Sequence, residues 1–368
     1  MGKPKTKKIL FLGQLPPPWH GVSAINSWLL NSKQLTKYYS FYPINITTAK
    51  TISDIGKKSW IKYFSFLKIL SFTIYKLIKH NPDASYITLT PTGSAFYKDS
   101  IILFLLKLFR KPIIVHLHGK GITEWVNSKP KFVNYYYKRI LKNTNVIVLG
   151  EYLQNDLKSV YNHRPFIVPN GIPLIIKSRK SKIQAPYLEV IFLSNLMKAK
   201  GILDFIESLN FLKMRGREFK AKIIGDSGDL SIDYIKQEII SRYLQNDVEV
   251  SGPLYGIEKQ ECLINADVLV FPSHYESFGL VILEAMQAGL SIIATNEGCV
   301  SEILEDGENG FIIEKSNPKS ITDALEKLIL NPTLRRNFGE KNRAKFISNY
   351  TLDVFENNIL KVLNQIIS

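Results

Sequence analysis

The stretch HYESFGLVILEAM, residues 274–286, places two acidic side chains, Glu276 and Glu284, eight residues apart around a nearly uninterrupted apolar run. The preceding VLVFPS, 268–273, is typical of a short buried strand, and the GLVILEAMQAG that follows is typical of a helix. A strand-to-helix turn at 277–279 would direct unpaired backbone N–H groups out of the carboxyl edge of a sheet, where open α/β folds bind ligands. Taken alone, the pattern fits a ligand site and a solvated surface helix with two incidental acids equally well.

The composition indicates a folded, two-domain protein. A chain of 368 residues is long for one core, and its 45% hydrophobic and 11% aromatic content suits globular domains. Cys262 and Cys299 are the only cysteines, which fits a reducing compartment and excludes a disulfide scaffold. No CxxC or His-rich spacing suggests a structural metal site.

The N-terminal segment MGKPKTKKILFLG passes from a basic start directly into a strand pattern, so we expect no secretory signal. The longest apolar runs, such as IILFLL at 101–106, are far shorter than the roughly 18 residues that a membrane-spanning helix needs. Together with the cysteine usage, this predicts a cytoplasmic protein.

Charge is distributed unevenly along the chain. Residues 1–185 contain 29 Lys and Arg and 6 Asp and Glu, a net charge of +23, whereas residues 186–368 contain 19 and 26, a net charge of −7. A basic half joined to an acidic half favours two domains with different partners. The positive charge of the N-terminal half predicts an anionic partner: nucleic acid, a membrane surface or a phosphorylated substrate. Because its basic residues are scattered and no nucleic-acid motif is present, we expect no nucleic-acid partner.

Strand-like and helix-like segments alternate twice along the chain, which predicts parallel sheets. The fold class that we expect is α/β, with two doubly wound Rossmann-like domains facing each other across a cleft. The predicted boundaries are an N-terminal domain, a Lys- and Ser-rich linker, a C-terminal domain and a final helix that packs back on the first domain: 1–175, 176–187, 188–350 and about 351–368.

In the second domain, four loops should open on one side of the sheet: SNLMKAKG, IIGDSGD, PSHYESFG and ATNEGCVSEIL. The first of them carries Lys198 and Lys200 ahead of an amphipathic helix. Lysines and helix-end N–H groups suit a diphosphate, and a carboxylate suits ribose or sugar hydroxyls. A lone loop lysine is usually a solvated one, but the four loops together favour a ligand site.

These motifs resemble those of the retaining family-4 glycosyltransferases (glycosyl transferases group 1), which have the GT-B fold. ESFGLVILEAMQAG, with PS before it and SEILEDGENGF after it, is similar to their signature of two glutamates spaced E-x7-E. FLSNLMKAKG resembles their phosphate-binding segment, IVPNGI their hinge, VHLHG their catalytic-histidine segment and PPPWHGVS their first-domain glycine loop. The resemblance covers nearly the whole chain and is densest over 188–314. It implies that the N-terminal domain binds the acceptor and the C-terminal domain binds the nucleotide sugar.

The resemblance implies a role for each matching residue. Glu284 would accept hydrogen bonds from the donor's ribose, Glu276 would position the transferred sugar, and Lys200 would neutralise the diphosphate. The implied catalytic residues are His118, Glu276 and Lys200. The implied donor-binding residues are Gly21, Asn195, Lys198, Lys200, Glu276, Ser277, Phe278, Gly279, Leu280 and Glu284.

One position departs from the family pattern. Asn195 stands where these enzymes usually have a phosphate-binding arginine, so a bidentate, charge-assisted contact is lost. Lys198, which lies in the same loop, is the candidate to compensate for it. Of the two histidines in VHLHG, the resemblance favours His118, because Gly119 follows it at the strand end. His116 lies one pleat deeper, where a structural role is expected, and His20 is a further candidate for the cleft lining.

The sequence contains no Asp-x-Asp, the motif with which other transferases hold a cation against the diphosphate. We therefore expect no metal cofactor, with Lys200 and helix-end dipoles stabilising the leaving group. In retaining members of this fold the leaving phosphate is held to assist attack on the same face of the sugar. Glu276 is thus expected to position the sugar without forming a covalent bond.

The segment KKSWIKYFSFLKILSFTIYKLIKH, 57–80, is rich in lysines and aromatic residues. It could lie at a membrane surface beside anionic lipids, or it could be an ordinary helix packed on the first sheet with solvated lysines. The charge of the whole N-terminal half favours membrane contact, on the inner face of the plasma membrane. An acceptor carried on a polyprenyl diphosphate would account for the charge and the aromatic residues together.

The sequence thus predicts a retaining hexosyltransferase that uses a nucleotide diphosphate sugar, most simply a UDP-sugar. Its acceptor would be a lipid-linked or other glycan in bacterial capsule or O-antigen synthesis. The alternatives are a transferase acting on a small soluble acceptor and a catalytically silent, sugar-nucleotide-binding partner subunit. Asn195 is the one feature that favours the silent subunit.

Overall fold

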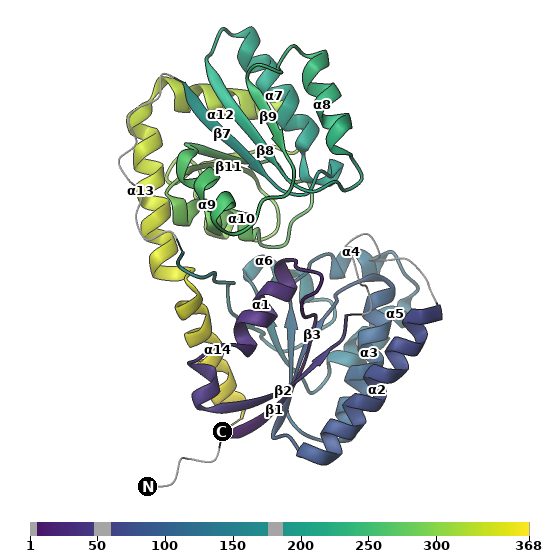
Figure 1. The fold of residues 1–368 in the computed structure, drawn as a ribbon. Coiled ribbons are helices and arrows are strands. Elements are labelled where there is room, and N and C mark those ends of the chain that lie inside the picture. Colours follow the sequence, from purple (N-terminus) through teal and green to yellow (C-terminus); the bar gives the residue numbers. More distant parts are fainter. Residues whose placement is uncertain (1–5, 48–59, 176–186, 368) are drawn as a thin grey trace. The chain divides into compact units, whose positions relative to one another are not determined.

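The computed structural model describes residues 6–47, 60–175 and 187–367, in two compact units (Figure 1). Unit 1 comprises Met1–Gly171 and Leu352–Ser368, and unit 2 comprises Ile172–Thr351. Residues 176–186 of the predicted linker lie outside the described residues. Each unit is described by itself below.

The described strands of unit 1 form one six-stranded sheet in the order β2-β1-β3-β4-β5-β6, and every neighbouring pair is parallel. The strands are β1 (Lys7–Gly13), β2 (Tyr39–Asn45), β3 (Ala84–Leu89), β4 (Ile113–Leu117), β5 (Asn145–Val148) and β6 (Phe166–Ile167). The helices are α1 (Gly21–Leu30), the 3₁₀ turn η1 (Leu35–Lys37), α2 (Trp60–His80), α3 (Gly93–Leu108), α4 (Ile122–Asn127), α5 (Lys131–Leu141), α6 (Glu151–Leu157) and α14 (Leu352–Ile366).

The direction of each crossover decides which face of this sheet a helix covers. From β1 the chain passes through α1 to β2 on one side, and then returns through α2 to β3 on the other side. Right-handed crossovers therefore place α1 on one face, and α2, α3 and α5 on the opposite face (Figure 1). The switch point between β1 and β3 brings the loop before α1 to the carboxyl edge of the sheet.

The C-terminal helix α14 belongs to unit 1. Its residues Phe355, Ile359 and Leu363 recur every four positions and are buried, as expected for one face of an amphipathic helix. The Tyr39 hydroxyl donates a hydrogen bond to Asn364 Oδ1 at 2.7 Å, which ties the helix to β2.

The described strands of unit 2 form a second parallel six-stranded sheet, in the order β12-β11-β10-β7-β8-β9. The strands are β7 (Leu188–Leu193), β8 (Phe219–Ile224), β9 (Val248–Ser251), β10 (Val268–Phe271), β11 (Ser291–Thr295) and β12 (Phe311–Ile313). The helices are the 3₁₀ turn η3 (Lys198–Lys200), α7 (Ile202–Met214), α8 (Ile232–Ser241), α9 (Gly256–Asn265), α10 (Leu280–Ala288), α11 (Val300–Ile303), α12 (Pro318–Leu330) and α13 (Pro332–Asn349).

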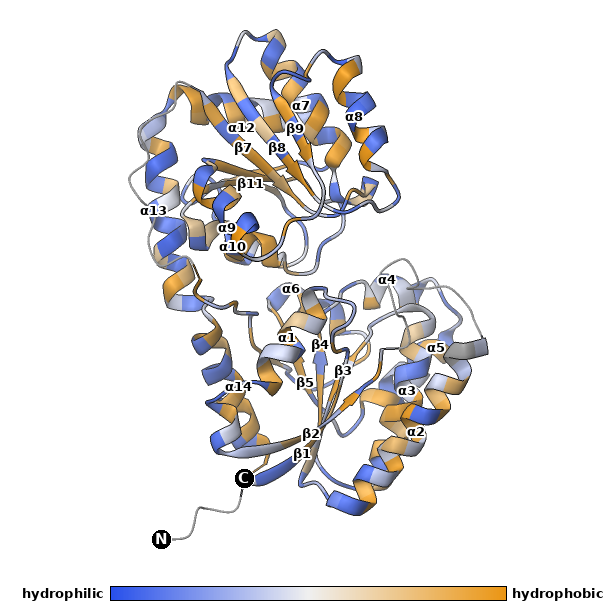
Figure 2. Ribbon diagram, in the orientation of Figure 1, coloured by the Kyte–Doolittle hydropathy of each residue, from blue (hydrophilic) through white to orange (hydrophobic). Residues whose placement is uncertain are grey.

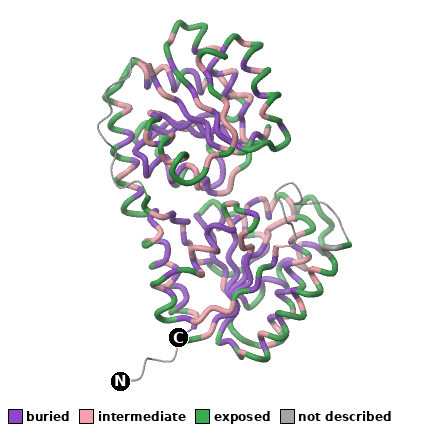
Figure 3. The backbone as a smooth tube through the Cα atoms, in the orientation of Figure 1, coloured by how far each residue is buried: buried purple, intermediate pink, exposed green. Residues whose placement is uncertain are grey.

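The strands at the centre of the sheets, among them β3, β4, β10 and β11, are fully buried, and the two centres are purple in Figure 3. Parallel strands that are covered by helices on both faces need such continuous apolar sequences. The two predicted doubly wound α/β sheets are therefore confirmed.

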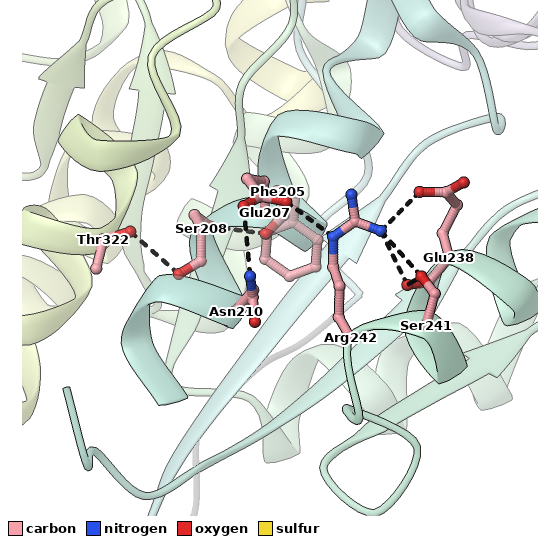
Figure 4. Close-up of polar contacts among 8 residues, drawn as sticks. All are labelled: Phe205, Glu207, Ser208, Asn210, Glu238, Ser241, Arg242 and Thr322. Atoms are coloured by element: carbon pink, nitrogen blue, oxygen red, sulfur yellow. Dashed lines mark hydrogen bonds and ion pairs between the residues drawn. The ribbon is translucent and has the colours of Figure 1, made fainter. Parts of the chain in front are cut away.

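Polar contacts fix the helices around the unit 2 sheet (Figure 4). Arg242 pairs with Glu207 of α7 at 2.8 Å and with Glu238 of α8 at 2.7 Å. The hydroxyl of Thr322, on α12, donates to the backbone carbonyl of Ser208 at 3.0 Å. These contacts hold α8 and α12 against α7, the helix that follows the Lys200 loop.

Candidate functional site

The switch point of the unit 2 sheet lies between its adjacent strands β7 and β10, because the chain leaves β7 for β8 on one side and reaches β10 on the other. The loops after these two strands are the KAKG loop with Lys200 and the HYESFG loop with Glu276. In open α/β sheets this is the place where a ligand binds. The topology therefore joins two segments that lie about 75 residues apart in the sequence.

The HYESFG loop ends at Gly279, which is the N-cap of α10 and has φ +86°. This left-handed conformation suits glycine, because other residues adopt it only with strain. Within the described part of the chain no side chain caps the N terminus of α10, and its first turn contains no acidic residue. The first N–H groups of the nine-residue helix therefore retain their capacity to bind an anion.

Lys200 and Glu276 meet at this site. The Nζ atom of Lys200 lies 2.9 Å from Oε2 of Glu276 and 3.2 Å from the backbone carbonyl oxygen of Tyr275. The other carboxylate oxygen of Glu276 accepts the N–H of Ser277 at 2.9 Å. Both side chains are partly exposed, so a ligand can reach the cation and the carboxylate together.

Further contacts lock the two loops together. The carbonyl oxygen of Ala199 accepts the N–H of His274 at 2.9 Å. A Cβ at Gly201 would lie 2.0 Å from the carbonyl oxygen of Pro272, so only glycine allows this approach. His274 Nε2 lies 2.5 Å from the carboxylate of Asp204 in the first turn of α7. Lys200 is thus held beside the β10 loop by backbone geometry as well as by its own charge.

A glycine in the loop after β11 packs directly against the backbone of the HYESFG loop. Gly298 has φ +58°, and a Cβ there would lie 2.4 Å from the carbonyl oxygen of Glu276 and 2.5 Å from that of Ser277. The next residue, Cys299, donates its N–H to the carbonyl of Ser277 at 3.0 Å. The position of Glu276 therefore depends on a third loop, which sequence spacing does not reveal.

The second glutamate of the E-x7-E pair also forms an ion pair with a lysine. Glu284 Oε1 lies 2.7 Å from Nζ of Lys259, on α9, and both side chains are partly exposed. Lys259 was not singled out from the sequence, because it lies 25 residues before Glu284 and belongs to no motif. The described structure thus holds both glutamates in ion pairs.

The other predicted residues of unit 2 also follow the switch-point strands. Asn195 and Lys198 are exposed in the loop after β7, and the backbone N–H of Lys198 donates to Asp229 at 3.0 Å. Phe278 is buried and packs edge-to-face with Tyr350, with ring centroids 6.4 Å apart, whereas Leu280 begins α10. Lys200 thus differs from Lys198 in this loop: its side chain is only partly exposed and forms the ion pair with Glu276.

In unit 1, His118 follows β4 directly and is buried, and its ring lies 3.9 Å from that of His116. Burial, with a contribution from His20, lowers the pKa of His118 to about 3. Burial also lowers the pKa of His116 well below its ordinary value, and the Tyr86 hydroxyl contacts its Nδ1. His118 is therefore a neutral imidazole at physiological pH, and its Nε2 has no hydrogen-bond partner among the described residues.

The glycine loop of unit 1 ends in a capped helix. His20 is the N-cap of α1: its Nδ1 accepts the N–H of Ser23 at 3.4 Å, and the Ser23 hydroxyl accepts the N–H of His20 at 2.9 Å. Gly21 is exposed in the first helical position. His20 and His118 both follow strands of this sheet, β1 and β4, and thus both belong to the loops at its carboxyl edge.

In the part of the chain that the structure describes, no three His, Cys, Asp or Glu side chains are grouped so as to hold a metal ion. The expectation of metal-independent activity stays a prediction, and its test is given below.

Comparison with known proteins agrees with this geometry. The glycosyltransferase of Rickettsia africae has a TM-score of 0.79 over 99% of both chains at 16% identity. The Anabaena protein HepE, solved in complex with UDP-glucose, has a TM-score of 0.72 over 97% of this chain and 99% of its own, at 18% identity. The capsular polysaccharide biosynthesis glycosyltransferase CapM of Staphylococcus aureus is 25% identical over 328 residues, or 84% of each chain.

The two doubly wound units and these neighbours define the fold as GT-B, the fold of a large class of glycosyltransferases. The family model described as Glycosyl transferases group 1 matches residues 175–345. The chain is therefore a glycosyltransferase whose second unit is similar to the glycosyl transferases group 1, and the resemblance predicted from the sequence is confirmed.

Proposed function

We propose that this glycosyltransferase transfers a hexose from a nucleotide diphosphate sugar, a UDP-sugar in the simplest case, to a lipid-linked glycan with retention of the anomeric configuration. The observation that carries the proposal is the pairing of Lys200 with Glu276 beside the uncapped N terminus of α10. A cation, a hydroxyl-binding carboxylate and unpaired N–H groups are the three elements that a sugar diphosphate requires. HepE, which shares the fold, binds UDP-glucose, and CapM serves capsule synthesis.

The proposed donor pose uses each group for one part of the ligand. Lys200 and the first N–H groups of α10 face the diphosphate, Glu276 accepts hydrogen bonds from the sugar hydroxyls, and Glu284 accepts those of the ribose. In the described structure Glu276 and Glu284 are each paired with a lysine. Donor hydroxyls would therefore add to or replace ion pairs that already hold the carboxylates in position.

In the transfer step, an acceptor hydroxyl attacks the anomeric carbon while the bond from that carbon to the diphosphate oxygen breaks. The nucleoside diphosphate leaves with the electron pair, and a phosphate oxygen takes the proton of the attacking hydroxyl. Lys200 and the α10 dipole stabilise the negative charge that develops on the leaving group. This stabilisation needs no metal ion, so we expect chelation by EDTA to leave the rate unchanged; complete loss of activity would overturn that expectation.

His118, with its neutral ring, is suited to hydrogen bonding and not to charge stabilisation. Because its pKa is lowered to about 3, it offers an acceptor or donor nitrogen to a sugar hydroxyl over the whole physiological range. We assign it to the sugar side of the reaction, in agreement with the role that the resemblance implied.

A catalytically silent, donor-binding subunit remains a second candidate, because Asn195 lacks the charge of the arginine that the family usually carries there. Turnover by the isolated chain separates the two candidates. With donor and a lipid-linked acceptor mixture, release of the nucleoside diphosphate supports the enzyme, whereas binding without release supports the silent subunit.

The first experiment is a thermal-shift panel of UDP-, GDP- and dTDP-sugars on the wild type and on Glu284→Ala. A donor at about 100 times its Kd stabilises the folded state by about 2.7 kcal/mol. One stabilising nucleotide, with a shift that is lost in the variant, is the expected result. No shift with any nucleotide would contradict the donor site, and the anomeric configuration of the product, read by NMR coupling constants, tests retention.

A further inference from the structure

One face of the unit 1 sheet is covered by α2, α3 and α5 (Figure 1). α3 and α5 pack side by side: the rings of Phe96 and Tyr137 stack with centroids 4.2 Å apart, and Ser100 shares a hydrogen bond of 2.7 Å with the Tyr136 hydroxyl. α2 leads into β3 and α3 leads out of it, so the two helices are neighbours on the same face.

The outer surface of α2 is apolar, which is the reverse of an ordinary surface helix. Its buried positions are Ile69, Thr73 and Leu77. The exposed positions recur at the spacing i, i+3, i+4, i+7 and thus share one face. They are Trp60, Tyr63, Phe64, Leu67, Ile74, Tyr75 and Ile78. Trp60 is 82% exposed, Phe64 72% and Ile78 69%, so these are outward-pointing side chains and not the edge of a core.

The two neighbouring helices continue this apolar surface. Along α3 the exposed residues Tyr97, Ile101, Phe104 and Leu108 again share one face. α5 adds Phe132 and Tyr135. Hydrophobic segments are visible along α2 and α3 in Figure 2, and exposed segments along α2 in Figure 3. We call this set of exposed side chains the α2–α3–α5 face.

The α2–α3–α5 face is also strongly basic. Exposed cationic residues lie on these helices or directly after them: Lys68, Lys79, Arg110, Lys111, Lys131, Lys138, Arg139 and Lys142. The one acidic residue of the three helices, Asp99, is buried, and it pairs with Lys98 and accepts the N–H of Thr90. Asp83, three residues after α2, is exposed and accepts the N–H of Lys8 at 2.7 Å, so a single exposed carboxylate stands against these eight cations.

We propose that the α2–α3–α5 face lies against an anionic lipid bilayer, with its aromatic and aliphatic side chains in the interface and its lysines and arginines at the headgroups. Large exposed apolar patches are uncommon on monomers and mark binding surfaces. A patch that combines aromatic residues with cations fits the boundary between acyl chains and anionic headgroups. In the described part of the chain no helix is long and apolar enough to cross a membrane, so the contact would be peripheral.

Charge decides between this occupant and a second copy of the chain. Two copies that met through this face would bring eight exposed cations of one against the same eight of the other, with Asp83 as the one exposed carboxylate among them. Anionic headgroups instead attract each lysine or arginine that lies near the membrane surface. The inference deepens the proposed function by supplying a surface for a lipid-linked acceptor, but its test contains neither donor nor acceptor.

The test is sedimentation of the full chain with vesicles of phosphatidylcholine containing about one third phosphatidylglycerol, compared with pure phosphatidylcholine vesicles. The triple variant Phe64→Ser, Leu67→Ser and Ile78→Ser removes exposed apolar residues of α2, and should reduce partition into anionic vesicles at least tenfold. The matched control replaces three exposed apolar residues of unit 2, Met214, Ile240 and Leu330, with serine, and should change partition less than threefold.

The fluorescence of Trp60 reports on the same event, because a tryptophan that enters the bilayer interface emits at shorter wavelength. The blue shift on adding anionic vesicles should disappear in Trp60→Phe, which leaves three other tryptophans, and binding should weaken as salt is added. Equal partition into neutral vesicles, or no partition at all, would overturn the proposal. A dimer in solution that the triple variant abolishes would assign the face to a second copy. Nucleotide binding is measured separately, so either result leaves the donor site to its own test.

Discussion

The Nζ atom of Lys200 lies 2.9 Å from Oε2 of Glu276, although the two residues are 76 positions apart. Each comes from the loop after a strand at the switch point of the unit 2 sheet, and the backbone contact between Ala199 and His274 holds the loops at this separation. Under the proposed function, the pair would present a positive and a negative group to one sugar diphosphate.

Lys200→Ala should lower the rate of transfer far more than it destabilises the fold. Loss of a single group that stabilises developing charge costs about 10²- to 10³-fold in kcat, and we expect a loss of that order. Lys198→Ala is the comparison variant: the sequence also assigned Lys198 to donor binding, but its side chain is exposed in the same loop, and we expect less than a fivefold change. Steady-state kinetics of the two variants checks this. Equal losses would show that the loop's total charge matters and the Lys200–Glu276 geometry does not.

Glu284→Gln and Lys259→Met should have different effects on nucleotide affinity, although they remove the two ends of one ion pair of 2.7 Å. If Glu284 accepts hydrogen bonds from the ribose, its replacement should weaken UDP binding by about 10-fold or more, since charged hydrogen bonds contribute about 1.5–3 kcal/mol. Lys259→Met leaves that carboxylate free for the ribose and should change the Kd less than threefold. Calorimetric titration of both variants with UDP measures the two Kd values. A larger effect of Lys259→Met than of Glu284→Gln would assign the binding role to the lysine.

Gly298→Ala should weaken donor binding without contacting the donor. The added Cβ would lie 2.4 Å from the carbonyl oxygen of Glu276, so the HYESFG loop must shift, and φ +58° adds backbone strain. Gly307→Ala is the control, because Gly307 has φ +74° but no atom within 4 Å of the added Cβ. We expect both variants to lose about 1–3 kcal/mol of stability through strain, and Gly298→Ala alone to lose at least tenfold in nucleotide affinity. Unchanged affinity would show that Glu276 does not depend on this support.

The fold should lose stability as the pH falls below about 6.5. The pKa of His118 is lowered from 6.5 to about 3 by burial and by His20, and that of His116 is also lowered. The unfolded chain therefore binds protons on these rings that the folded chain does not, so their contribution to stability is present above pH 6.5 and is lost towards pH 3. One such histidine changes the free energy of unfolding by about 1.4 kcal/mol per pH unit within that window.

Urea unfolding at pH 7.5 and 5.5 checks this prediction on the wild type and on His118→Gln. The variant should show a shallower loss of stability between the two pH values, by up to about 1.4 kcal/mol per pH unit, because it lacks one of the two rings. The exposed His163 provides the control variant His163→Gln. A wild type whose stability does not change between these pH values would contradict the neutral state assigned to His118.

Local patterns in the sequence were sufficient to predict the fold class and the strand-to-helix turn at 277–279. Short apolar runs alternating with periodic segments predicted parallel sheets, and both sheets are parallel throughout. The apolar run before Ser273 and the position of Gly279 correctly predicted the strand β10, the turn and the helix α10. Strand length, a glycine in the left-handed conformation and helix periodicity are all local properties of the chain. The grouping of the KAKG and HYESFG loops also follows from strand ends that share one sheet edge.

The ion-pair partners and the exposed face were decided by tertiary structure. Residue spacing could not predict the ion pair of Lys259 with Glu284 or the contact of Gly298 with the carbonyl oxygen of Glu276. Both depend on how separate helices and loops pack. For 57–80 the sequence allowed either a packed helix or a surface helix, because apolar residues recur on more than one of its faces. Burial of Ile69, Thr73 and Leu77 against the sheet resolves this for the described helix, and leaves its aromatic stripe in solvent. The sequence determines the hydrophobic periodicity of a helix. Which side of the helix packs on the core depends on the tertiary structure, because the core consists of residues from many segments.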